Sequence, residues 1–458
     1  MKKLFVMGLC LYLQMCRCSA DSDVVDPESQ NAPTEDQSGD SGYFSAIEPS
    51  ELEKIEALVA ANCPYGALKE PKNGYDKIAK LLAGFRTAED RKIATSRVEY
   101  EEFIADQWRA LERASLSPVG SWAQEYIGPF VENGDVLFYP FGGPDVAYPI
   151  KFFPTVREYV LLGLEPIGSL EGINKGFREE IFYIALRRAV NNYLGKGFFI
   201  TSEMSSQFSD RNRVNGVVCL ILLELAKLGF DIDNVERISI DKKGLERPAG
   251  KNMVGCVKIT FSGNGDASPR RIYYMRANLH NSSVNAVNTV RNFMKRRRVV
   301  TLVKSASYAM HDSSFSRIRD LILNDSQLLL QDDSGIPFCY FGDRWEKFIF
   351  GEYTTPTLKT FQKNRQQDLA DYYASHEKFR IPFKIGYGFN QERPNLLLAV
   401  SPQRQKGPPS VAETSTNESM KSGENDVSGR NLLRSDGLID SSSTPSPPPI
   451  EDRFLPTL

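Results

Sequence analysis

Three short polar segments carry the residues whose types and spacing suit chemistry. Each follows an apolar stretch, and together they contain Asp145, Lys304, His311, Asp332 and Asp333. In open α/β sheets, ligand sites gather at the carboxyl ends of strands. If the strands before these segments are largely parallel, the polar side chains come to one edge of a sheet.

The first segment has the outline of a nucleotide-binding βαβ unit. A strand expected at 136–141 ends in the turn Gly142-Gly143-Pro144. A second expected strand, at 159–164, ends beside Glu165. Glycines let backbone amides approach a ligand, and an acid after the second strand can hold a ribose hydroxyl pair. S-adenosylmethionine enzymes use this scheme with a looser glycine pattern. The cofactor-binding candidates are therefore Gly142, Gly143, Asp145 and Glu165.

Several features weigh against a nucleotide in this unit. The pattern GxGxxG is absent, and Pro149 and Pro154 would disturb the crossover helix. An exported location would also make such cofactors scarce. A tight turn in a sheet protein is the alternative, so the sequence identifies no cofactor.

The second segment runs from Lys304 to Asp312, between an expected strand and an expected helix. His311 is suited to act as an acid or a base near neutral pH. Lys304 and Ser305 would serve as a base and nucleophile pair, although the pattern SxxK is missing. In the alternative interpretation, Asp312 or Ser313 caps the following helix and His311 bonds to backbone.

The third segment, Asp332-Asp333-Ser334-Gly335, follows another expected strand. Two carboxylates there are suited to hold a divalent cation or to do acid–base work. Neighbours on an extended chain point to opposite sides, so joint action needs a turn at Ser334-Gly335. The alternative is an Asp-rich turn whose side chains bond to backbone. We assign catalytic candidacy to His311, Lys304, Asp332 and Asp333.

Histidine and cysteine content excludes a metal centre built on familiar motifs. The chain has 3 histidines and 7 cysteines, without HExxH, GxSxG or P-loop patterns. Cys63, Cys219, Cys256 and Cys339 follow the expected leader, and they are far apart in the sequence. No metal ligand is assigned.

The N-terminus predicts export. Lys2 and Lys3 precede an apolar run at 4–15, and Cys18-Ser19-Ala20 offers small residues for a signal peptidase. The run is too short to span a bilayer, and no later apolar run is long enough. We expect cleavage near Ala20 and a periplasmic location. The formal net charge of −2 gives no global attraction for nucleic acid.

Alternating strand and helix patterns predict an α/β fold with a mixed sheet and helices on its faces. We expect a signal peptide at 1–20, a disordered linker at 21–48, a helical N-terminal cap at 49–134, an α/β core at 135–399, and a disordered Pro- and Ser-rich tail at 400–458. Further strands are expected at 237–240, 257–261, 271–275, 299–303, 327–331, 347–350 and 383–387. Helices are expected at 51–61, 87–114, 174–194, 214–228, 283–295, 315–323 and 366–374. Consecutive strands between 238 and 275 indicate an antiparallel portion.

The same motifs resemble an uncharacterised family of exported bacterial proteins. The resemblance covers about residues 120–390 and is carried by FYPFGGPD at 138–145, GLEPIG at 163–168, KSASYAMH at 304–311 and QDDSGIP at 331–337. That family has no assigned activity. The resemblance therefore implies one structural unit with a signal peptide, and it lends no catalytic role.

The leading hypothesis is an exported α/β protein with one polar cleft that binds a small polar ligand, with hydrolytic or transfer chemistry. The cleft would be lined by Asp145, Glu165, Lys304, His311, Asp332 and Asp333. Two alternatives stay open. One is a non-catalytic envelope or partner-binding protein. The other is a methyltransferase-like nucleotide-binding scaffold with an open groove over Gly142-Gly143 and Glu165 beside it. The sequence decides neither enzyme status nor oligomeric state.

Overall fold

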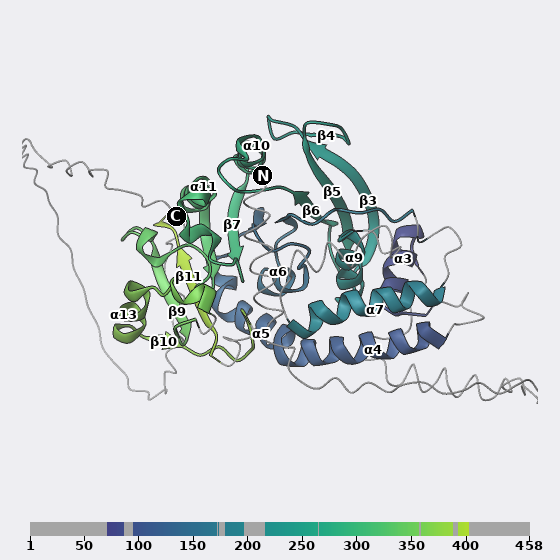
Figure 1. Cartoon of the computed structure of the whole chain (residues 1–458), viewed down its shortest axis with the longest axis horizontal. Coiled ribbons are helices and arrows are strands. Elements are labelled where there is room, and N and C mark those ends of the chain that lie inside the picture. The colour runs from purple at the N-terminus through teal and green to yellow at the C-terminus, as the bar shows by residue number, and fades with distance from the viewer. Residues whose placement is uncertain are drawn as a thin grey trace, which may run out of the picture.

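The computed structural model describes residues 71–86, 95–171, 173, 179–196, 216–263, 265–356, 359–387 and 393–402. The expected signal peptide, both expected disordered segments apart from residues 400–402, and the helix expected at 51–61 lie outside these ranges. The described residues form an α/β fold around one 11-stranded mixed sheet, with helices on both faces (Figure 1).

The strand order across the sheet is β10-β9-β11-β8-β7-β1-β2-β6-β5-β3-β4. The strands are β1 Asp135–Tyr139, β2 Glu158–Gly163, β3 Asp231–Ile240, β4 Glu246–Pro248, β5 Val254–Ser262, β6 Arg270–Arg276, β7 Arg298–Val303, β8 Ser326–Gln331, β9 Glu346–Gly351, β10 Lys378–Phe379 and β11 Asn395–Val400. The helices are α3 Gly74–Leu82, α4 Thr95–Leu111, α5 Ser117–Tyr126, α6 Ala147–Phe152, α7 Glu179–Lys196, α9 Val218–Lys227, α10 Val284–Met294, α11 Ser316–Asp325, α12 Lys359–Gln362 and α13 Gln367–Ser375.

Five parallel strands, β8-β7-β1-β2-β6, form the centre of the sheet. Their continuous apolar sequences follow from burial on both faces. In β1, Leu137 and Tyr139 pack into the core on one face, whereas Val136 and Phe138 pack into the core on the other. The strand β5 is antiparallel to β6, and β3 is antiparallel to β5, which confirms the antiparallel portion predicted from the sequence.

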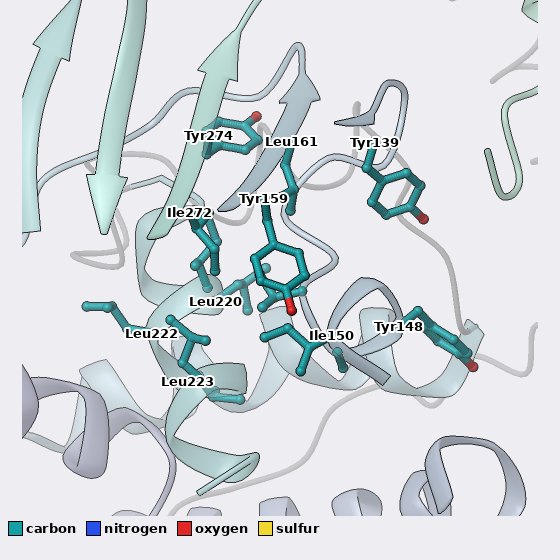
Figure 2. Close-up of a cluster of buried hydrophobic side chains, with 14 of the residues drawn as sticks. Tyr139, Tyr148, Ile150, Tyr159, Leu161, Leu220, Leu222, Leu223, Ile272 and Tyr274 are labelled. Atoms are coloured by element: carbon teal, nitrogen blue, oxygen red, sulfur yellow. The ribbon is translucent and has the colours of Figure 1, made fainter. Parts of the chain in front are cut away.

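Helices α6 and α9 cover one face of the sheet, and α10, α11 and α13 cover the other. Figure 2 shows Leu220, Leu222 and Leu223 of α9 packed below Tyr159 of β2. Every residue of α9 is buried, including Glu224. This explains why its sequence is apolar on all sides.

The chain turns to opposite faces after the neighbouring strands β1 and β7. The segment after β1 enters α6 on the first face, and the segment after β7 enters α11 on the second. Such a divergence is a topological switch point, and ligands of open α/β sheets bind outside the carboxyl ends of the strands at such points. The three polar segments of the sequence lie at this edge.

Two expected elements differ in the structure. Residues 383–387 are not a strand, because Phe383 and Ile385 pack into the first-face core without a ladder partner. The missing strand is β11, which inserts antiparallel between β8 and β9. The helix expected to end at 114 continues instead through the π-helical segment Glu112–Leu116 into α5. The helix α6 has only six residues, with Pro149 in its first turn, where proline is tolerated, and Pro154 directly after its C-cap.

Candidate functional site

Segments that follow β1, β2, β7 and β8 bring five of the six predicted cleft residues to the carboxyl edge of the sheet. Asp145, Glu165, Lys304, Asp332 and Asp333 are all buried, with at most 4% of each residue exposed. Burial of five ionisable groups is costly unless each is paired or hydrogen-bonded. Their partners therefore decide which of them hold the edge together and which are available to a ligand.

An ion pair joins the segments after β1 and β7. Lys304 Nζ lies 3.1 Å from Asp145 Oδ2 and 4.1 Å from the centroid of the Tyr148 ring. The Tyr139 hydroxyl donates to the same carboxylate oxygen at 3.0 Å. Burial opposes the charge of Lys304, but the attraction of Asp145, Tyr148 and Asp332 outweighs burial and raises the pKa of the amine. Lys304 and Asp145 thus bridge the switch point.

The side chain of Asp332 accepts hydrogen bonds from backbone N–H groups, including one in the segment after β7. Its Oδ2 accepts from Ser305 N at 2.8 Å, and its Oδ1 accepts from Ser334 N at 3.0 Å. The Ser334 hydroxyl in turn accepts from Ala306 N at 2.7 Å. Burial raises the pKa of Asp332, although these hydrogen bonds and Lys304 act in the opposite direction. Both oxygens of this carboxylate are engaged in fixing the loop.

The loop after β7 has an unusual backbone. Ser305, Ser307 and Tyr308 have φ values of 53°, 53° and 55°, in the left-handed region that side chains other than glycine rarely adopt. Each such residue costs roughly 1–3 kcal/mol and persists only where its surroundings enforce it. Asp332 holds Ser305 N, and the Tyr387 hydroxyl accepts from Ser307 N at 2.6 Å. Strain of this kind concentrates at ligand sites and switches.

Asp333 faces other groups than Asp332 does. Its Oδ2 accepts from the Tyr308 hydroxyl at 2.6 Å, and its Oδ1 accepts from Asn395 Nδ2 at 3.1 Å. Burial, followed by repulsion from Asp332, raises the pKa of Asp333 to about 6. The two neighbouring carboxylates therefore fix different parts of the loop and do not converge on one point.

The stability of the protein should depend on pH through Asp333. The folded state retains a proton on Asp333 up to about pH 6, whereas the unfolded chain releases it near the ordinary pKa of 3.8. This contribution is present at pH 4 and is lost as pH rises through 6. The free energy of unfolding of Asp333→Asn minus that of the wild type should therefore be larger at pH 7 than at pH 4, by on the order of 2 kcal/mol. Urea unfolding of both proteins at pH 4 and at pH 7 measures this change. The same difference between variant and wild type at the two pH values would contradict the prediction.

His311 is half-buried, and its ring bonds to the backbone of Asp333, as the alternative interpretation of the sequence predicted. Its ring contacts Tyr308 edge-on, with centroids 5.1 Å apart. Burial lowers its pKa to about 4, so the imidazole is neutral at physiological pH. Its Nε2 is buried and has no hydrogen-bond partner within the described residues. Asp312 caps the 3-10 turn Ser313–Phe315 by accepting from Ser314 N at 2.8 Å. The sequence predicted a cap on the helix itself, but the N-cap of α11 is Phe315, which makes no side-chain hydrogen bond there.

Glu165 lies beside the glycine turn. A Cβ placed on Gly163 would lie 2.3 Å from Glu165 Oε2, 2.6 Å from the Tyr274 hydroxyl and 3.0 Å from Gly143 Cα. Only glycine at 163 permits this approach. Gly143 has a φ of 58°, and its N–H donates to Leu162 O at 3.0 Å. The turn after β1 and the acid after β2 are therefore neighbours, as the nucleotide-binding hypothesis requires.

Sequence reasoning missed Glu224, which occupies the start of α6. Its Oε2 accepts from Val146 N and from Ala147 N, each at 2.8 Å. Asp145 Oδ1 accepts from Tyr148 N at 3.3 Å. A single acid inside the apolar run of α9 was the available signal, because an acid buried there must find donors. In dinucleotide folds, the backbone amides at this helix N-terminus donate to pyrophosphate. In this protein they donate to the carboxylates of Glu224 and Asp145.

A separate cavity of about 480 Å³ lies away from this edge, between α5, the end of α6 and the start of β6. Its lining includes Ala123, Ile127, Phe152, Phe230 and Arg270. Within the described residues, no group of three His, Cys, Asp or Glu side chains is placed to hold a metal ion. None of the described helices has the length and apolar character of a membrane span.

The chain matches no protein-family profile, and a search of curated proteins returns no significant relative. The resemblance to a family of exported bacterial proteins therefore stays a prediction, and the site has to be interpreted from its own geometry and charge.

Proposed function

We propose that the switch point at the carboxyl ends of β1, β2 and β7 forms a crevice that binds a cationic nucleoside of the S-adenosylmethionine type, and that the chain is a methyltransferase-like scaffold. The observation that carries the proposal is the filling of the α6 N-terminus by Glu224 and Asp145. A carboxylate in that position leaves no place for a pyrophosphate and favours a ligand without phosphate groups.

The topology supports the same ligand class. If β1, β2, β6, β7, β8, β9 and β11 are numbered 1 to 7 in chain order, the sheet runs 3-2-1-4-5-7-6, and strand 7 is antiparallel. The first five positions follow the order of doubly wound nucleotide-binding folds. An antiparallel strand between the fifth and sixth is the order of the methyltransferase scaffold. This is a fold-level analogy, so the chemistry of the site has to carry the function.

Charge at the edge discriminates among nucleotides. Asp145, Glu165, Asp332 and Asp333 are acidic, and Lys304 is the cation paired among them. Phosphates would be repelled there, whereas a sulfonium and an ammonium group would be attracted. This sign of charge separates an S-adenosylmethionine-type ligand from NAD or ATP.

Each residue has a definite role in this proposal. Glu165 accepts from the ribose hydroxyls, and the Gly142-Gly143 turn lets backbone approach the ligand. Lys304, Asp145 and Asp332 position the loops. His311 has no contact with the ligand in this proposal, because its Nε2 is buried and its ring bonds to the backbone of Asp333.

The predicted export decides in which compartment the protein encounters its ligand. A binding experiment with the purified protein does not depend on it. Residues 21–458 would be titrated calorimetrically with S-adenosylmethionine, S-adenosylhomocysteine and NAD. We expect binding of S-adenosylmethionine, weaker binding of the uncharged thioether S-adenosylhomocysteine, and no binding of NAD. Binding of NAD, or of neither sulfur nucleoside, would overturn the proposal.

A further inference from the structure

A second charged surface lies at another place in the fold, where the β3–β4 hairpin meets the end of α10 (Figure 1). Asn292 Nδ2 of α10 donates to Lys242 O at the hairpin tip at 2.8 Å. A Cβ on Gly244, whose φ is 75°, would lie 2.4 Å from Asn292 C and from Phe293 N. The tip is therefore packed against the C-terminal end of the helix.

This contact gathers basic side chains from two elements that are about fifty residues apart in the sequence. Lys242, Lys243, Lys295 and Arg296 are exposed, and we call these four residues the basic platform. Among the described residues, no ion pair engages any of the four. The platform is a local excess of positive charge on a chain whose formal net charge is −2.

The acidic residues near the basic platform have other partners or lie beyond ion-pair distance. Asp241 accepts from the backbone N–H groups of Lys243 and Leu245, each at 2.9 Å, and pairs with Arg247 at 2.9 Å. The half-buried Asp325 interacts electrostatically with Arg291 and Lys295, but neither is within ion-pair distance. The platform therefore keeps its positive sign.

The dipole of α10 accounts for cations at Lys295 and Arg296. It does not account for Lys242 and Lys243, which come from the hairpin and bring like charges close to the first pair. Such an arrangement costs free energy that an anionic partner would recover. Leu245, 38% exposed, is an apolar group next to the two lysines. Lysines that flank an exposed apolar side chain suit the interface of a bilayer.

We propose that the basic platform, with Leu245, docks the protein on an anionic phospholipid surface. The lysines and arginine approach the negative headgroups while Leu245 enters the boundary with the acyl chains. Four exposed cations from two elements, beside the exposed Leu245, fit an extended surface better than a single bound anion. The candidate site at the carboxyl edge takes no part in this contact.

The test is co-sedimentation of residues 21–458 with vesicles of phosphatidylglycerol and phosphatidylethanolamine, and with vesicles of phosphatidylcholine alone. We expect binding to the anionic vesicles only, with the affinity falling as salt is raised. Reversing the platform by Lys242→Glu, Lys243→Glu, Lys295→Glu and Arg296→Glu should weaken binding at least about tenfold. The contribution of Leu245 is apolar and is not screened by salt, so Leu245→Ser should weaken the binding to anionic vesicles that remains at high salt.

The matched control reverses four exposed cations elsewhere: Arg113→Glu, Arg188→Glu, Lys359→Glu and Lys378→Glu. It changes the net charge by the same amount and should bind within about twofold of the wild type, since screening confines the effect to charges near the membrane. Circular dichroism checks that both variants are folded. Equal losses in both folded variants, equal binding to phosphatidylcholine, or equally tight binding to a DNA duplex would each overturn the proposal.

Discussion

Replacing Lys304 by alanine is expected to lower the free energy of unfolding by about 3–5 kcal/mol, because it leaves Asp145 buried without its cation. Asp145 is 2% exposed, and its Oδ2 lies 3.1 Å from Lys304 Nζ. The loss includes the contact of the ammonium group with the Tyr148 ring. Urea unfolding at pH 7 measures it.

Two further variants separate the buried charge from lost packing. Lys304→Met combined with Asp145→Asn removes both charges and keeps most of the volume, so it should recover much of the loss. Lys151→Ala breaks the more exposed ion pair of Lys151 with Glu112, 2.9 Å long, and should cost less than about 1 kcal/mol. If Lys304→Ala costs no more than Lys151→Ala, the ion pair does not hold the switch point together.

Glu165→Gln is expected to weaken the binding of S-adenosylmethionine by roughly tenfold to a hundredfold. A hydrogen bond to a charged group is worth about 1.5–3 kcal/mol, and the carboxylate accepts from ribose hydroxyls in the proposed complex. The fold should be retained, because the amide oxygen of glutamine can still accept from the Tyr274 hydroxyl that now lies 3.2 Å from Glu165 Oε2.

Calorimetric titration of the variant measures this change, and Glu171→Gln is the control. Glu171 is an exposed acid six residues further along the chain, so its replacement removes the same charge from the neighbourhood without touching the crevice. Equal weakening in both variants would mean that Glu165 acts only through the general field and not through contact with the ligand.

The central strands could be predicted from the sequence because burial on both faces makes them apolar throughout. This is how 299–303 and 327–331 were located within a residue of β7 and β8. The strand β11 was missed, since 395–400 adjoins the polar tail and its partners β8 and β9 lie far away in the chain. The alternation at 383–387 predicted a strand that no neighbour pairs with.

The candidate site was predictable to the extent that parallel strands end at one edge. This rule predicted that Asp145, Lys304 and Asp332 lie together. In the structure, Lys304 pairs with Asp145, and Asp332 accepts from the backbone N–H of Ser305, the residue after Lys304. The rule did not reveal that Asp332 and Asp333 face different partners, which depends on the turn that Ser334 makes. Nor did it find Glu224, because its donors at the start of α6 lie 77 and 78 residues away in the chain.

The most direct test of the proposed crevice is amide hydrogen exchange with and without S-adenosylmethionine. Binding at the carboxyl edge predicts protection of residues 142–147, 163–167 and 304–308, and no change at residues 120–131 and 150–155 around the separate cavity. Protection that is confined to the cavity, or absent everywhere at saturating ligand, would contradict the assignment of the crevice as a nucleoside site.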